Sequence, residues 1–193
     1  MGNLFYRLSV IDGKIPAKSE SEKKFPDPEA KGRSLTAESV LTALRYHHLT
    51  VEETDPEEPN IVRFIYDQIH YRINTANLPY MSMEAGFRCD SDKEDTELMI
   101  QIAQDLTYNM YIAKVFVSPK GDYYVFQVDL LAETYLPFRD SVRTYLDVLI
   151  DAQHRFIDQY NRKRAEQKQA TQAALQTTLL ASQTDAAGNK IVS

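Results

Sequence analysis

Two alternating segments separated by two residues constrain the fold of this chain most. Ile61–Tyr66 and residues 69–75 are rich in β-branched and aromatic side chains, which are typical of strands. Asp67 and Gln68 lie between them and would form a two-residue hairpin turn, although neither is the glycine that such turns prefer. The sequence therefore predicts an antiparallel hairpin near the middle of the chain.

Three further strands and three helices complete the expected fold. Residues 80–89, Ala113–Val117 and Tyr123–Leu131 have strand character, and Pro119 and Gly121 supply a turn between the last two. Ser34 or Thr36 would cap a first helix, and Asp95 or Thr96 a second. A long third helix would have Pro137 in its first turn. The predicted fold class is α+β, a mostly antiparallel five-stranded sheet packed with three helices in the order α-β-β-β-α-β-β-α.

Composition changes along the chain predict three regions. Residues 1–34 are interpreted as an N-terminal extension and linker, with a short strand or hairpin around residues 4–11, and residues 35–164 as the α+β domain. Residues 165–193 are rich in Ala, Gln and Thr, and most of this C-terminal tail is expected to be mobile.

Charge and cysteine content narrow the class of protein. The net charge is −6, with 28 acidic against 22 basic residues, which argues against a nucleic-acid partner. The single cysteine, Cys89, excludes an internal disulfide. No apolar run approaches the roughly 20 residues of a membrane span, and the N-terminus lacks the pattern of a signal peptide. We therefore expect a cytoplasmic protein with no membrane partner.

The residues that could carry chemistry are scattered. His47 and His48 are adjacent, so on a helix they cannot easily share one metal ion. Neither a calcium loop nor a phosphate-binding glycine loop is present in the sequence. We therefore expect no catalytic residue, metal or cofactor. The alternative is a hydrolase or small-ligand-binding protein whose site assembles from His70, Cys89 and Asp129.

A surplus of aromatic residues favours a protein-interaction module. The chain has 12 Tyr and 8 Phe, concentrated in the predicted strands and the last helix. A sheet covered by helices on one face only would leave aromatic side chains on its other face, where tyrosine gives a large contact area. The predicted contact residues for a protein partner or a homodimer are Tyr66, Tyr71, Tyr124 and Phe126.

Several segments resemble the YbjN-like family of bacterial proteins, which share the fold of type III secretion chaperones. The resemblance covers roughly residues 36–160 and is carried by residues 62–73, residues 106–109 and Ala113–Val117. Family members often have Gly at the first hairpin turn, where this chain has Asp67 and Gln68. The resemblance implies a small α+β domain that pairs with itself or with a partner segment. It also implies a regulatory or chaperone-like role without enzymatic activity.

Overall fold

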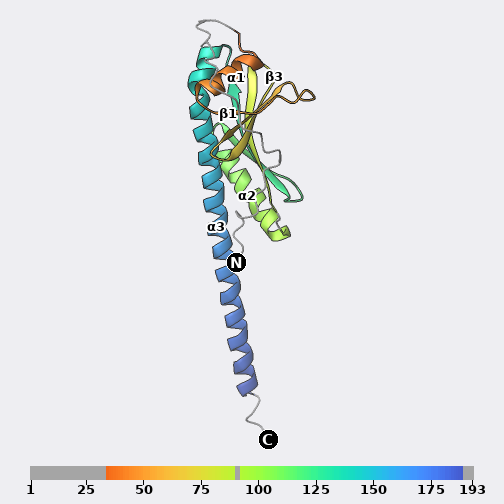
Figure 1. The fold of residues 1–193 in the computed structure, drawn as a ribbon. Coiled ribbons are helices and arrows are strands. Elements are labelled where there is room, and N and C mark those ends of the chain that lie inside the picture. The colour runs from red at the N-terminus through yellow and green to blue at the C-terminus, as the bar shows by residue number, and fades with distance from the viewer. Residues whose placement is uncertain (1–33, 90–91, 189–193) are drawn as a thin grey trace. The chain divides into compact units, whose positions relative to one another are not determined.

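The computed structural model describes residues 34–89 and 92–188 (Figure 1). The predicted strand around residues 4–11 lies outside these residues. The chain divides into two compact units, Met1–Phe156 and Ile157–Ser193. Within the described part, the first unit contains every strand and two complete helices, and the third helix begins there.

One antiparallel sheet of six strands forms the centre of the first unit, in the order β1-β2-β3-β4-β6-β5. The strands are Thr50–Val51 (β1), Ile61–Tyr66 (β2), Ile69–Asn77 (β3), Tyr80–Arg88 (β4), Ala113–Val117 (β5) and Tyr123–Leu131 (β6). The sequence predicts five strands, and this number is wrong because it misses β1. Two residues are too short for an alternating pattern, and β1 is defined only by its pairing with β2.

The predicted hairpin turn between β2 and β3 is confirmed. Tyr66 and Ile69 are paired across it, and Asp67 and Gln68 have φ angles of 48° and 64°. Both residues therefore occupy the left-handed region, as a type I′ turn requires. The preference of Asp for turns supports this at Asp67, but Gln68 adopts it without the freedom of glycine.

A bulge interrupts the pairing of β3 with β4. Asn74 pairs with Ser82 and Asn77 with Tyr80, so two residues of β3, Thr75 and Ala76, lie opposite one residue of β4. The displaced backbone is still hydrogen-bonded. Thr75 N donates to Asn60 O (2.8 Å) and Ala76 N donates to the Asn74 side chain (3.0 Å). The bulge is therefore a stable feature at the end of the strand.

Local capping explains where the first two helices begin. Helix α1 (Ala37–Tyr46) has the predicted cap Thr36, which forms a capping box with Ser39. Helix α2 (Lys93–Asn109) begins earlier than predicted. Its cap is Asp92, whose side chain accepts from Asp95 N, so the choice of Asp95 or Thr96 is wrong. Several acidic residues in succession made the position of this cap ambiguous in the sequence.

Helix α3 (Tyr135–Gly188) has Pro137 in its first turn, as predicted. It is much longer than the sequence pattern indicates, since residues 165–188 continue it where a mobile tail was expected. High helix propensity of Ala, Gln and Leu accounts for this. In the second unit, residues 165–178 are exposed, so this part of the helix buries no side chain of its own.

The core lies on one face of the sheet. Alternate residues of each long strand are buried, as Val62 and Phe64 are in β2. Phe156 of α3 stacks on Tyr124 at 5.2 Å between ring centroids and meets Phe126 edge-on at 5.6 Å. Helix α2 contributes a buried apolar face that contacts β5. In the described part of the chain, no helix has the length and apolarity needed to cross a bilayer.

Candidate functional site

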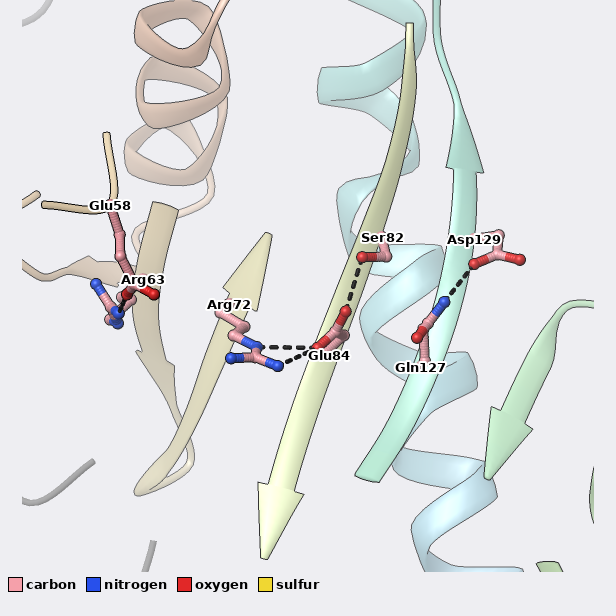
Figure 2. Close-up of polar contacts among 7 residues, drawn as sticks. All are labelled: Glu58, Arg63, Arg72, Ser82, Glu84, Gln127 and Asp129. Atoms are coloured by element: carbon pink, nitrogen blue, oxygen red, sulfur yellow. Dashed lines mark hydrogen bonds and ion pairs between the residues drawn. The ribbon is translucent and has the colours of Figure 1, made fainter. Parts of the chain in front are cut away.

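The sheet face opposite the core is the open face, and its centre is a polar row that crosses five strands. Strand register places Arg63, Arg72, Glu84, Gln127 and Lys114 side by side, one from each of β2, β3, β4, β6 and β5. Figure 2 shows four of these side chains on the face that is turned away from the helices. The alternation of each strand directs these residues outward while their neighbours enter the core.

The side chains of the polar row are paired with one another or with adjacent residues. Arg72 binds Glu84 through two nitrogens, Nε at 2.9 Å and Nη2 at 2.7 Å. Ser82 Oγ donates to the other oxygen of Glu84 at 2.8 Å. Arg63 forms an ion pair with Glu58 at the β2 end (Figure 2). The charges of this half of the face are therefore largely satisfied within the chain.

Asp129 is the centre of a second polar cluster at the β6 end. Its Oδ2 accepts from Lys114 and its Oδ1 accepts from Gln127 Nε2 at 2.6 Å. The hydrogen bond from Lys114 is the main cause that lowers the pKa of the Asp129 carboxyl. The pair is half-exposed on both sides, so its electrostatic energy is screened by solvent.

Large apolar side chains flank this ion pair on the open face. Phe116 is 47% exposed, Tyr123 is 44% exposed and Leu131 is 57% exposed. Phe116 pairs with the half-buried Val125 across β5 and β6. We call Phe116, Tyr123, Val125 and Leu131 the β5–β6 patch. Phe116, Tyr123 and Val125 lie together at one end of this patch. Leu131 lies at the other end, beyond Gln127 and Asp129. Neighbouring apolar side chains bordered by polar ones are typical of contact surfaces.

The predicted partner residues lie mostly elsewhere. Tyr71, Tyr124 and Phe126 are 2%, 2% and 1% exposed, so the expectation that they lie on an open face is wrong. They belong to aromatic stacks of the core, such as Phe64 with Tyr71 at 5.3 Å. The fourth, Tyr66, is half-buried at the end of β2, with the Arg143 guanidinium 5.0 Å above its ring.

On β6, sequence reasoning took a buried tyrosine for the exposed one. Residues 123–126 of β6 alternate between the faces, and the exposed member of the two tyrosines is Tyr123, one residue from the predicted Tyr124. A shift of one residue along a strand exchanges core and surface. Phe116 was not among the predicted residues, although β5 carries a signal for it. Lys114 lies two residues earlier on the same face of the strand, and its charge indicates that this face is turned outward.

The residues of the alternative catalytic site are held in separate environments. His70 Nδ1 lies 2.9 Å from Glu52 Oε1, and buried Cys89 donates through Sγ to Gly121 O at 3.0 Å. Asp129 is paired with Lys114 on the open face. Among the described residues, no group of three His, Cys, Asp or Glu side chains could hold a metal ion.

The predicted histidine pair is divided between two roles. His47 Nε2 lies 2.6 Å from Arg139 O, and Arg143 donates to His47 O at 2.6 Å. These contacts join the end of α1 to the first turns of α3. His48 has a φ angle of 58° and ends the α1 segment. His47 thus joins α1 to α3, whereas His48 is an exposed residue in the turn that follows α1.

Comparisons with known proteins concern the fold. No protein-family model matches this chain, and no curated protein matches it. Among solved structures, the suggested transcription regulator YbjN from E. coli matches with a TM-score of 0.47 and 11% identity, over 69% of this chain and 94% of that one. An uncharacterized protein from Methanothermobacter thermautotrophicus matches with a TM-score of 0.49 and 10% identity, over 67% and 99%.

One of these two matches is YbjN, whose family the sequence was predicted to resemble. At such low identity they concern the fold alone, and the function of this chain is argued from its own surface.

Proposed function

We propose that this chain is a non-enzymatic protein-interaction module that associates with a second copy of itself through the β5–β6 patch. The observation that carries the proposal is the exposure of three large apolar side chains, each 44–57% exposed, at the two ends of the patch on the open face of β5 and β6. Neighbouring exposed apolar residues, such as Phe116 and Tyr123, often mark a contact surface. The proposed surface is the uncovered sheet face that the sequence suggested, but its residues differ from the four predicted ones, three of which are buried in the core.

Charge complementarity favours a second copy as the partner. Two-fold related copies bring the same patch together, so the patch must complement itself. Lys114 and Asp129 are adjacent on neighbouring strands, with Phe116 toward one end of the patch and Leu131 at the other. A two-fold axis between the charged residues would place Lys114 of each copy opposite Asp129 of the other. Phe116 of each copy would then lie opposite the Leu131 end of the other copy.

The other parts of the proposal have separate support. The non-enzymatic character is supported by the separate engagement of His70, Cys89 and Asp129. A regulatory or chaperone-like role would use the patch to hold a segment of another protein. We place the chain in the cytoplasm because its one cysteine is a buried free thiol.

The solution mass of the full chain over a range of concentrations tests the proposal. We expect a dimer that Phe116→Lys converts to a monomer, because the variant buries an unpaired charge in the contact. Leu175→Lys is the matched control, since Leu175 is 60% exposed on the helical extension. A monomer at every concentration, or dissociation by Leu175→Lys alone, would overturn the assignment to the patch.

A further inference from the structure

A hollow opens at the end of the open face where β3 and β4 separate. It has a volume of about 310 Å³ and is lined by β3, β4 and β6. Its polar lining consists of Asn74, Asn77, Tyr80, Ser82 and Asp129. This volume is at the lower end of the range of small-ligand pockets, which begins at about 300 Å³.

The β3 bulge accounts for the hollow. Beyond Asn74, the two residues Thr75 and Ala76 displace β3 from its regular pairing, and the strands pair again only at Asn77 and Tyr80. Bulges often redirect side chains beside binding sites. Here the bulge is held by the Asn74 side chain, whose Oδ1 accepts from Ala76 N. That bond leaves the two Nδ2 hydrogens of Asn74 as donors at the wall of the hollow.

The groups around the hollow combine donors and acceptors at short range. Ser82 Oγ donates to Glu84 and keeps its lone pairs as acceptors. The Asn77 amide is exposed and offers both kinds of group. Tyr80 is 66% exposed, so one aromatic ring stands beside the polar wall. Such a ring provides an apolar surface with a polar tip.

The charge of the hollow is close to neutral. Its one carboxylate, Asp129, is paired with Lys114 and accepts from Gln127. This carboxylate would repel a strongly anionic ligand, and a cationic ligand would compete with Lys114 for it. A neutral ligand avoids both costs. Hydroxyl groups match the mixed wall best, because each hydroxyl donates one hydrogen bond and accepts two.

We propose that the hollow binds a neutral polyhydroxylated small molecule, such as a monosaccharide or a cyclic polyol. Asn74, Asn77, Ser82 and Asp129 hold its hydroxyl groups, and the Tyr80 ring covers its apolar face. The proposal does not rest on self-association, but Asp129 belongs to both sites, so a second copy bound at the patch would compete with the ligand for this carboxylate.

Amide spectra of the full-length chain, titrated separately with glucose, ribose and myo-inositol, test the proposal. We expect at least one of these probes to shift the amides of residues 74–82 and 129–130, with a Kd on the order of 1 mM. Tyr80→Ala should weaken that binding about tenfold, which corresponds to 1.4 kcal/mol. Tyr108→Ala is the matched control, since Tyr108 is 90% exposed outside the hollow, and it should leave the Kd unchanged.

The titration is repeated on Phe116→Lys, in which self-association cannot cover the hollow. Absence of shifts from all three probes in this variant would overturn the proposal. An unchanged Kd in Tyr80→Ala would do the same. A blocked dipeptide, acetyl-Ala-Ala-amide, serves as the competing probe. Its tighter binding at the same amides would assign the hollow to peptide recognition instead.

Discussion

The Thr107 hydroxyl of α2 is bonded to both backbone groups of Val115 in the edge strand β5. Val115 N donates to Thr107 Oγ1 at 2.9 Å, and Thr107 Oγ1 lies 3.3 Å from Val115 O. Edge strands present unpaired backbone groups that can recruit another strand. In β5, the Thr107 side chain binds the backbone groups of Val115, the middle residue of the strand. Association through the open face is therefore better supported than addition of a strand to β5.

Replacing Thr107 by Val keeps the shape of the side chain but removes its hydroxyl. Two backbone groups of Val115 then lose their partner, so we expect the free energy of unfolding to fall by about 1–3 kcal/mol. Urea denaturation measures the change. Thr42→Val is the control, because the Thr42 hydroxyl bonds only to Glu38 O of its own helix and should change stability by no more than about 0.5 kcal/mol. Equal effects of the two variants would contradict the edge-capping role.

The left-handed turn residues make a second prediction. Gln68 has a φ angle of 64°, a conformation that costs a residue with a Cβ roughly 1–2 kcal/mol. Glycine avoids this cost but loses more conformational entropy on folding. Gln68→Gly should therefore raise the free energy of unfolding by only about 0.5–1 kcal/mol. Gln68→Val should lower it, because β-branched residues avoid this region. Urea denaturation of both variants tests the turn, and stabilisation by Val would rule out this explanation.

Sequence patterns predicted most of the fold because they are local. The boundaries of β2, β5 and β6 follow from alternating apolar residues and turn chemistry. The exposed side chains of the sheet were harder to predict. Tyr123 and Tyr124 are adjacent and chemically identical, so only their neighbours on β6 distinguish them. Tyr124 shares its face with Phe126 and Val128. Tyr123, in contrast, shares its face with Gln127 and Asp129. The hollow was also missed, since it depends on a bulge whose residues show no distinct signal in the sequence.

The pairing of Asp129 with Lys114 predicts a dependence on pH. The hydrogen bond from Lys114 lowers the pKa of Asp129 in the folded chain. The resulting stabilisation is present above the ordinary aspartate pKa and is lost as the pH falls through the folded value. We expect the carboxyl resonance of Asp129 to titrate below the ordinary range. Lys114→Met should raise this midpoint, whereas Lys120→Met should leave it unchanged. No rise in Lys114→Met would contradict the assigned cause.

The buried Tyr71 hydroxyl predicts a loss of stability at high pH. Burial raises the pKa of Tyr71 from 10.0 to about 12, and the neighbouring Gln153 side chain offsets this rise in part. The folded chain therefore holds the phenol proton more tightly than the unfolded chain does. The stabilisation is complete below pH 10 and is lost as the pH rises toward 12, by a total on the order of 2 kcal/mol.

Tyr71→Phe isolates this contribution, because phenylalanine keeps the stack on Phe64 but has no proton to lose. We expect the free energy of unfolding to fall less steeply between pH 10 and 12 in this variant than in the unmodified chain. Burial also raises the pKa of Tyr124, and its contribution is common to both proteins, so their difference reports on Tyr71. Tyr108→Phe, at an exposed position, should follow the unmodified chain. Parallel curves for Tyr71→Phe and the unmodified chain would mean that the Tyr71 phenol titrates alike in the folded and unfolded states.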